Sequence, residues 1–418
     1  MEVILDDSAA DQVFAPALAR QSSALSRQTV TDQAPPPCLL SYRYLIVVSM
    51  NLTDREHQIV ALLRRDPMIG SAAIAERLGT TRASINVHLS NLGKKGVILG
   101  RGYLLSEQPG IVVIGGANVD VKARSAAPAT QHTSNPGHGS MAPGGVARNI
   151  AENLARLGTR THLITAVGRD ALGDNLLAQT SAAGVRLEYV HRTDLPTGTY
   201  TALLDSDGEL ILAVADMAAT DELGPDRIND ARDVIATAGL IVLDGNLASA
   251  SLVHALDLAS TADVRTILEP VSVPKAEALA AYITSDRPLY ALTPNRDELT
   301  ALTGLAARTD RQLRLAAHSL HQRGVEHVWI RLGEHGSLLS SGSGNATFIP
   351  AVPTTVEDVT GAGDAMLAAF CHAVLEGKDP VDAARYGHAA AALTISSPYT
   401  VRPDLTPRLV QAALNSLS

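Results

Sequence analysis

The residue types most suited to chemistry occur together in the segment DVTGAGD, residues 358–364. Gly361, Ala362 and Gly363 are small and open an apolar run of helical character, so their N–H groups and the positive end of a helix would point at one place. That arrangement suits a phosphoryl group in transfer. Asp364 would repel a resting anion, but it could accept the proton of an attacking hydroxyl. The alternative is an ordinary helix start with an acidic first turn, which the helix dipole favours anyway.

Two further segments place polar residues after glycine turns. Gly144 and Gly145 precede a helical pattern, and Asn149 lies about one turn into it. Asp120 follows the apolar strand IVVI and the turn GGAN. A carboxylate at the carboxyl end of a strand lies where open α/β sheets bind ligands, although Asp120 alone would also suit a turn.

A third segment, TPNRDE at residues 293–298, again comes directly after an apolar strand. Asn295 and Glu298 carry oxygen atoms that could orient magnesium and phosphate, directly or through water.

Alternating strand and helix patterns fill residues 109–418 and must position these side chains. Such a succession predicts an α/β fold with a mostly parallel sheet covered by helices. Residues 199–212 differ, because two strand patterns flank Ser-Asp-Gly at 206–208, which predicts a hairpin.

Residues 51–108 have another character. Thr53 and Glu56 form the pattern of a capping box, and helical patterns cover the stretch after Thr53 and residues 71–78 and 82–94. A short hairpin pattern with many glycines follows from residue 96. Three helices and a hairpin predict a winged helix-turn-helix domain.

The charge is distributed unevenly among these parts. The chain has a net charge of −9, which argues against nucleic-acid binding throughout, yet residues 51–108 carry 8 Lys and Arg against 5 Asp and Glu. We expect DNA contacts from the third helix and the wing tip, through Arg82, Ser84, Asn86, His88 and Arg101. The excess of three positive charges is small, so binding would need a dimer. A scaffold or dimerisation module with solvated basic residues is the alternative.

Composition sets broader limits. At 418 residues and 46% hydrophobic content, the chain is long enough for two or three domains and too apolar for general disorder. Two cysteines, no apolar run of about 20 residues and no signal-peptide pattern predict a cytoplasmic protein. Residues 1–50 hold no sustained period, so we expect a disordered extension there, or a natural start at Met50.

From about residue 110 onward the chain resembles the PfkB/ribokinase family of small-molecule kinases. GGVARNIAENLARLG, residues 144–158, matches its N-terminal signature, and DVTGAGDAM, residues 358–366, matches its C-terminal one. The resemblance implies a Rossmann-like α/β body, ATP as donor, Mg²⁺ as cofactor, and a small β lid formed by about 121–142 and 199–212.

The resemblance also implies roles for single residues. Asp364 would be the catalytic base, and Gly361, Ala362 and Gly363 the anion hole. The substrate hydroxyls would be held by Asp120, Gly144, Gly145 and Asn149, the phosphates and metal organised by Asn295 and Glu298, and a monovalent cation such as K⁺ held by Asp358 and Thr360. The nucleotide would lie near Arg331, Gly333 and Gly336, where this chain departs from the family's usual Thr-Leu-Gly. Glu269 likewise replaces an Asp that is common before Pro.

Within the family, the segments IGGANVD, SNPG, LDGN and EPVSVPK resemble the pseudouridine kinases. We therefore expect a pseudouridine or related nucleoside kinase, homodimeric, with a DNA-binding regulatory domain. Two alternatives stay open: a kinase of the same fold for ribose or another sugar or nucleoside, and a transcription regulator that uses the fold as a ligand sensor.

Overall fold

A computed structural model describes residues 52–66, 68–98 and 109–416 of the chain. The expected extension at 1–50 and the expected wing from residue 99 onward, including Arg101, lie outside the described residues.

Three helices form the first described part: α1 (Asp54–Arg65), α2 (Ser71–Arg77) and α3 (Arg82–Lys94). The capping box predicted at Thr53 and Glu56 is present, with both reciprocal hydrogen bonds made. Apolar side chains at helical spacing meet in a core of their own, which includes Ile59, Leu63 and Ile74. The three helices predicted from periodicity are thus confirmed.

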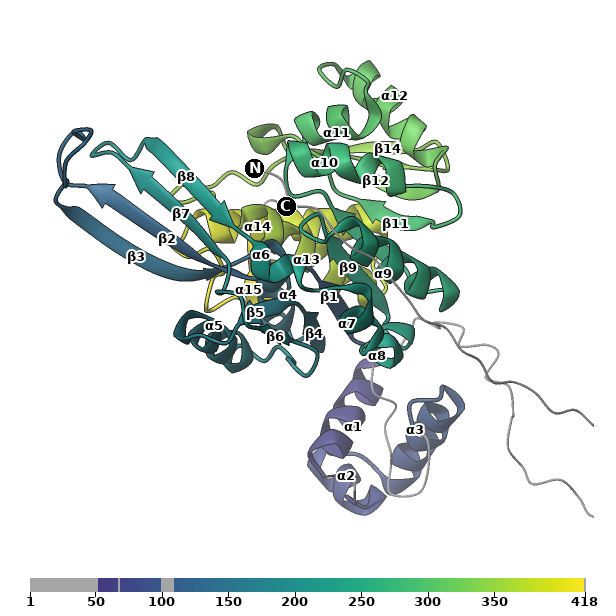
Figure 1. Cartoon of the computed structure of the whole chain (residues 1–418). Coiled ribbons are helices and arrows are strands. Elements are labelled where there is room, and N and C mark those ends of the chain that lie inside the picture. The colour runs from purple at the N-terminus through teal and green to yellow at the C-terminus, as the bar shows by residue number, and fades with distance from the viewer. Residues whose placement is uncertain (1–51, 67, 99–108, 417–418) are drawn as a thin grey trace, which may run out of the picture. The chain divides into compact units, whose positions relative to one another are not determined.

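The second described part is built on an eight-stranded sheet with the order β14-β13-β12-β11-β10-β9-β1-β4 (Figure 1). The five pairings from β12 to β4 are parallel, and β13 and β14 are added antiparallel at one edge. The mostly parallel sheet predicted from the strand–helix alternation is therefore confirmed, with an antiparallel edge. The strands are β1 (Ile111–Ile114), β4 (Thr161–Ile164), β9 (Leu240–Asp244), β10 (Thr266–Glu269), β11 (Leu289–Leu292), β12 (Val325–Arg331), β13 (Ser337–Ser341) and β14 (Ala346–Ile349).

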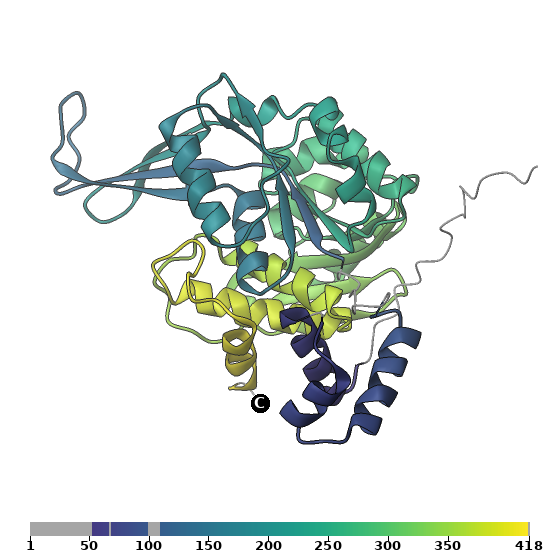
Figure 2. The same cartoon turned by 90° about the horizontal axis from the view of Figure 1, so that it is seen from below.

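Helices cover both faces of this sheet (Figures 1 and 2). Alternate strand residues point to opposite faces, so Val112 and Ile114 of β1 enter one core while Ile111 and Val113 enter the other. This is why the strand reads as a continuous apolar run. The first core contains residues of α7 (Pro225–Asn229), α8 (Arg232–Ala236), α9 (Ser249–Thr261), α10 (Val273–Leu279), α11 (Arg296–Thr303) and α12 (Asp310–His321). The second contains residues of α4 (Val146–Arg156), α13 (Ala362–Leu375), α14 (Pro380–Ile395) and α15 (Pro407–Asn415).

A separate four-stranded sheet extends away from the main one (Figure 1). Its order is β3-β2-β7-β8, with β2 (Asn118–Ser125), β3 (Gly137–Gly144), β7 (Thr199–Leu204) and β8 (Leu210–Asp216). The hairpin predicted at 199–212 is present as β7 and β8, although β8 runs further than expected. We call this sheet the lid. A short pair, β5 (Ala166–Gly168) and β6 (His191–Thr193), and the helices α5 (Ala171–Ala182) and α6 (Ala218–Asp221) complete the order of elements.

No helix within the described ranges combines the length and the apolar character that crossing a membrane requires.

Candidate active site

Asp364 lies in the first turn of α13 and is half-buried. Its Oδ2 accepts a hydrogen bond of 2.7 Å from the side-chain amide of Asn149 in α4. Burial raises the pKa of Asp364 to about 7, against the lowering effect of Asn149, while Glu269 raises it further and the cations of Arg331 and Arg148 lower it. A carboxyl group with this pKa titrates near neutral pH, which suits a general base.

The backbone before Asp364 has free N–H groups. Among the described residues, the N–H groups of Gly363 and Asp364 have no hydrogen-bond partner, as expected in a first helical turn. Gly361 caps the helix with φ +77°, and a Cβ there would lie 2.1 Å from the carbonyl oxygen of Thr400. The turn thus requires glycine at this position. The two N–H groups lie at the N-terminus of α13, where the helix dipole is positive.

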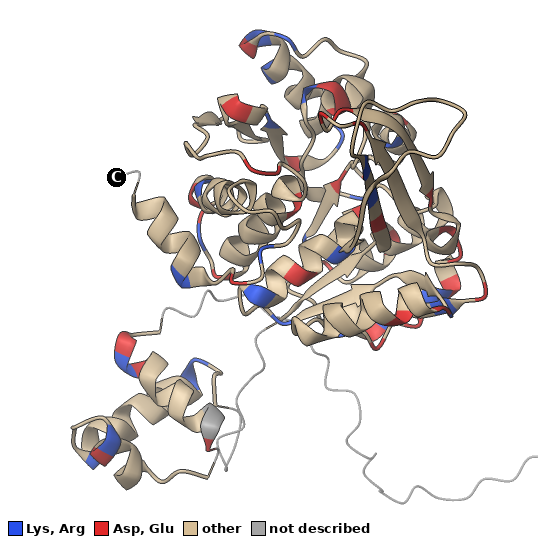
Figure 3. Cartoon of the chain, turned by 90° about the vertical axis from the view of Figure 1, so that its left-hand side faces the viewer, with Lys and Arg blue, Asp and Glu red and all other residues tan. Residues whose placement is uncertain are grey.

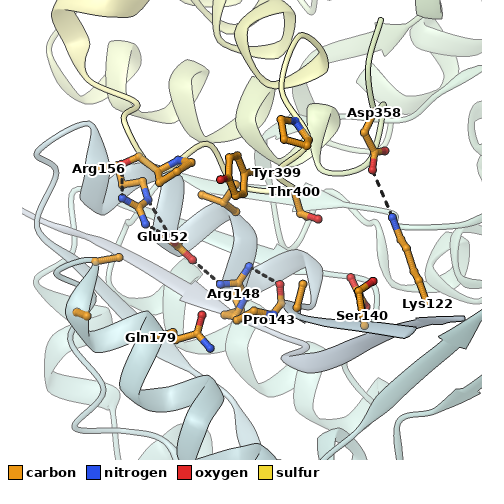
Figure 4. A pocket seen from close by; sticks show the side chains of 17 residues that line it. Lys122, Ser140, Pro143, Arg148, Glu152, Arg156, Gln179, Asp358, Tyr399 and Thr400 are labelled. Carbon is orange, nitrogen blue, oxygen red and sulfur yellow. Dashed lines mark hydrogen bonds and ion pairs between the residues drawn. The ribbon is translucent and has the colours of Figure 1, made fainter. Parts of the chain in front are cut away.

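A pocket of about 680 Å³ lies between the lid, helices α4 and α5, and the segments near residues 358 and 400 (Figure 4). Asp120, Lys122 and Ser140 enter it from the lid, and Arg148 enters it from α4. Its wall is completed by Ala142, Pro143, Glu152, Arg156, Gln179, Ala182, Ala183, Asp358, Pro398, Tyr399, Thr400, Val401 and Pro403. Asn149 and Asp364 are not in this wall, but Arg148 connects the wall to Asn149 by a short side-chain hydrogen bond.

Asp120 is the third residue of lid strand β2, and not the end of the first strand where the sequence pattern placed it. Its Oδ1 accepts a 2.7 Å hydrogen bond from the side chain of Asn118. Burial raises the pKa of Asp120, and Asn118, Arg148 and Lys122 lower it. The carboxylate lies against Gly144 of β3, where a Cβ would be 2.5 Å from it. Gly145 follows with φ +95° at the start of α4.

Arg148 is a buried pocket residue that the sequence motifs did not indicate. It is 1% exposed, and its guanidinium donates to the carbonyl oxygens of Pro143 and Gly144, to Glu152 and to Asn149. Glu152 in turn bonds Arg156, so a ladder of charges follows one side of α4 at spacings of four residues. The spacing of Arg148, Glu152 and Arg156 in the sequence could have indicated this ladder.

Asn295 and Glu298 lie close together, and both form hydrogen bonds that cap the N-terminus of their own helix, α11. The side chain of Asn295 caps α11 by accepting two N–H groups, and Oε2 of Glu298 accepts the N–H of Asn295 in return. Arg331 is paired with Glu298 at 3.2 Å and with Glu269 at 2.6 Å. Burial alone would lower the pKa of Arg331, but the two carboxylates raise it, so the residue stays cationic.

The Arg331 guanidinium also reaches the first turn of α13. A Cβ on Gly363 would lie 2.8 Å from its Nη1. Gly333 and Gly336 form a tight turn directly after β12, both with positive φ. Arg331 stands where the family usually has Thr. Its guanidinium, paired with Glu269 and Glu298, therefore lies beside Gly363 and the free N–H groups at the start of α13.

Magnesium needs oxygen ligands, and it usually keeps several waters and bridges to phosphate. Oε1 of Glu298 accepts no hydrogen bond from any described side chain or backbone group, so it is available to a hydrated ion. The described residues contain no cluster of three or more His, Cys, Asp and Glu that could hold a metal by themselves. These donors fit an ion that arrives with a phosphate ligand.

Asp358 and Thr360 form a local turn in front of α13. Oδ1 of Asp358 accepts the backbone N–H of Thr360 at 2.8 Å, and Oδ2 lies 3.3 Å from the ammonium of Lys122 in β2. Partial burial would raise the pKa of Asp358, but the bonds from Thr360 and the charge of Lys122 hold it below its usual value.

Asp244 at the end of β9 is a second residue whose role the sequence did not resolve. Its fully buried carboxylate accepts the backbone N–H groups of Gly116 at 3.0 Å and Ala147 at 2.9 Å, and both the backbone and side-chain N–H of Asn246. Asn246 in turn accepts a short hydrogen bond from Lys275. Asp244 therefore joins the β1–β2 turn to the first turn of α4, which carries Asn149.

In the three-helix part, the residues predicted to contact DNA lie on two borders of α3. At about 100° per residue, Arg82 and Asn86, both exposed, share one border, and Ser84 and His88, both half-buried, share the other. The exposed face between them carries Val87, which is 60% exposed. Figure 3 shows acidic and basic residues interspersed along the ribbon in both described parts.

Comparison with known proteins agrees with this geometry. Residues 108–407 match the profile of the pfkB family carbohydrate kinases, and residues 52–98 match a winged helix-turn-helix DNA-binding profile. An uncharacterized sugar kinase, YeiI of Escherichia coli, is 33% identical over 85% of this chain and 97% of its own. The pseudouridine kinase of E. coli is 33% identical over 72% of this chain and 95% of its own.

Among solved structures, Arabidopsis thaliana ribokinase complexed with ribose and ATP superposes with a TM-score of 0.66 at 26% identity, covering 74% of this chain and 99% of that one. The match in both sequence and fold spans nearly the whole length of these relatives. The expected ribokinase-like α/β fold is confirmed, and the chain belongs to the pfkB family of carbohydrate kinases, which are ATP-dependent phosphotransferases, and carries an N-terminal winged helix-turn-helix segment.

Proposed function

We propose that this protein phosphorylates the 5′-hydroxyl of pseudouridine, or of a closely related nucleoside, with ATP as donor and Asp364 as general base. The observation that carries the proposal is the Asn149–Asp364 hydrogen bond of 2.7 Å. It holds a carboxylate of pKa about 7 beside the N–H groups of a helix start. Oδ1 of Asp364 accepts no hydrogen bond from the described residues and is free to take the hydroxyl proton.

The acceptor would be oriented by α4 and the lid. Asp120 enters the pocket from β2, and its carboxylate can accept hydrogen bonds from ring hydroxyls. Gly144 leaves space for the Asp120 carboxylate and Gly145 for the backbone of Ala117, and Asn149 reaches toward Asp364 from the same helix start. Buried Arg148 and Asp244 would hold this geometry through their hydrogen bonds to Asn149 and to the backbone of Ala147.

The donor side would lie at the first turn of α13. The N–H groups of Gly363 and Asp364, with the α13 dipole, would hold the transferring phosphoryl oxygens. Arg331 lies beside Gly363 and adds positive charge there, while Asn295 and Glu298 organise the phosphates and a hydrated magnesium ion. Bound magnesium would supply neutralisation of the charge on the phosphate oxygens.

Two observations favour a nucleoside over a free pentose. The pocket of about 680 Å³ is within the range that holds drug-sized ligands, and it continues past Asp120 to Gln179 of α5, which leaves room for a base. The E. coli pseudouridine kinase is 33% identical to this chain, against 26% for the Arabidopsis ribokinase of known structure.

The N-terminal part would be a DNA-binding regulatory domain. The borders of α3 carry Arg82 and Asn86 on one side and Ser84 and His88 on the other, with Val87 between them. Polar borders suit phosphates and base edges, and an exposed valine suits a thymine methyl group. Coupling of DNA binding to nucleoside binding would make the chain both an enzyme and a sensor.

The test is a phosphorylation screen with the full-length protein, ATP and magnesium over pseudouridine, uridine, inosine and ribose. We expect the highest kcat/KM for pseudouridine, with the phosphate on the 5′-oxygen by mass spectrometry and phosphorus NMR. A preference for ribose would identify a sugar kinase of the same fold. Binding of a nucleoside without turnover would instead indicate a sensor.

A further inference from the structure

An ion pair spans the pocket between the lid and the segment that leads to the anion hole. The ammonium of Lys122 in β2 lies 3.3 Å from Oδ2 of Asp358, three residues before Gly361 (Figure 4). Lys122 follows Asp120 by two positions in the same strand, so both side chains point to the same face of the lid and both line the pocket. A positive charge from the lid therefore reaches the turn in front of α13.

The carboxylate of Asp358 has both oxygens engaged. Oδ1 accepts the backbone N–H of Thr360 at 2.8 Å, and Oδ2 faces Lys122. The hydrogen bonds of Thr360 and the charge of Lys122 keep the pKa of Asp358 low, so the group is ionised near neutral pH. The carboxylate thus connects the lid ammonium to the backbone of the turn.

These residues do not fit the K⁺ ion that the family resemblance implies at Asp358 and Thr360. A potassium ion would have to share Asp358 with an ammonium already at 3.3 Å, and two like charges a few ångströms apart repel. Both carboxylate oxygens of Asp358 already accept hydrogen bonds, Oδ1 from the backbone of Thr360 and Oδ2 from Lys122. The negative charge of Asp358 is already neutralised by the ammonium of Lys122.

We propose that the Lys122 ammonium is a tethered monovalent cation, which replaces a free K⁺ at the turn before α13 and makes turnover independent of added monovalent ions. The inference rests on the proposed kinase function and concerns how its anion hole is supported. Lys122 acts through Asp358 and the backbone of residues 359–361, so it is a positioning residue. Because Lys122 belongs to β2, the charge reaches the turn from the lid sheet.

The competing interpretation is an ordinary surface ion pair. Both side chains are partly exposed, 39% for Lys122 and 30% for Asp358, and pairs of this kind contribute little to stability. Such a pair would leave the ion dependence of the enzyme unchanged when it is removed. Dependence on monovalent ions therefore separates the two interpretations.

The experiment measures kcat with the full-length protein at constant ionic strength of about 0.1 M, set with tetramethylammonium chloride or with KCl. For the wild-type protein we expect kcat values that agree within about twofold between the two salts. For Lys122→Met we expect kcat to fall about tenfold or more in tetramethylammonium and to recover largely in K⁺, because a free ion can then reach Asp358. Lys122→Arg keeps the charge and should keep the wild-type behaviour.

Arg124→Met is the matched control, since Arg124 is two positions further along β2 and donates to the carbonyl oxygen of Ser206, away from Asp358. It should show no K⁺ dependence. A readout without turnover is the unfolding temperature, which K⁺ should raise for Lys122→Met and leave unchanged for the wild type.

A wild-type enzyme that requires K⁺ would overturn the inference, and this arm needs no variant. A loss in Lys122→Met that K⁺ does not restore, or no loss at all, would overturn it as well. Absence of phosphorylation by the wild type in both salts would instead count against the proposed function, and the thermal arm would still report on the tethered cation.

Discussion

The side-chain amide of Asn149 donates a 2.7 Å hydrogen bond to Oδ2 of Asp364, a residue 215 positions away in the chain. This bond joins the two signature segments of the family at one point between α4 and α13. It stabilises the ionised carboxylate, while burial destabilises it and raises the pKa to about 7. The balance between these two effects leads to the first prediction.

The pH dependence of kcat/KM should show an acid limb with an apparent pKa of about 7, because only ionised Asp364 can accept the hydroxyl proton. Activity rises with pH through this value. Removing the stabilising amide in Asn149→Ala should move the limb to higher pH, since the hydrogen bond lowers the pKa. An acid limb that stays in place in Asn149→Ala would contradict this assignment.

Stability should depend on pH in the opposite sense. The pKa of Asp364 is higher in the folded protein than in the unfolded chain, so its favourable contribution is present below about pH 4 and is lost as pH rises through about 7. Asp364→Asn stays neutral at all pH values. We therefore expect its unfolding temperature to exceed that of the wild type at pH 8, and the difference to shrink or vanish at pH 4. A difference that is constant with pH would argue against a raised pKa.

Asp244 should matter for both stability and turnover although it does not line the pocket. Asp244→Asn replaces one acceptor oxygen by an N–H group that faces other N–H groups, and it leaves Lys275 without its buried counter-charge. We expect the free energy of unfolding to fall by about 3 kcal/mol, the scale for breaking a buried charge network. Denaturant titration measures this change.

The same variant should lower kcat more than it raises the KM for ATP, because Asp244 holds the start of α4 and not the nucleotide. Asp286→Asn is a control at an exposed aspartate and should leave both quantities near the wild-type values. Equal effects of the two substitutions would remove Asp244 from the positioning network.

DNA binding should be sensitive to substitutions on α3. Arg82→Ala should weaken binding to duplex DNA and reduce the slope of log K against log salt by about one, if Arg82 contacts a phosphate. Val87→Asp places a carboxylate at the centre of the exposed face and should abolish binding. Arg385→Ala, which removes an exposed cation outside the three-helix part, is the matched control. Fluorescence anisotropy at several salt concentrations measures all three, and equal affinities would favour a scaffold role for this domain.

Much of the fold could be predicted from local patterns. Helix capping at Thr53, the stop at Gly158 and the apolar run at 111–114 are each determined by a few neighbouring residues. The strand order of the main sheet, with β13 and β14 antiparallel at one edge, depends on pairings between distant segments. Patterns within one segment carry no information about such partners.

The site shows the same division. Asp364 was expected as the catalytic base and Asn149 as a substrate-binding residue, but the bond between them depends on how α4 and α13 pack. Asp120 was expected at the end of the first strand, but it lies within the lid. The reason is that β1 is followed by a second strand, β2, and not by a helix. Arg331, Asp244 and Asp358 each also have partners 33 to 236 positions away, and these distant contacts could not be predicted from the sequence.

The most direct test of the account compares kcat of the wild type and Asp364→Asn for pseudouridine phosphorylation, with ATP and magnesium saturating. Asparagine preserves the size of the side chain but cannot accept the proton. We expect 5′-phosphorylated product from the wild type and a decrease in kcat of about 10²–10⁴-fold in the variant, the contribution of a positioned base. A variant that phosphorylates pseudouridine at a rate near that of the wild type would contradict the central claim.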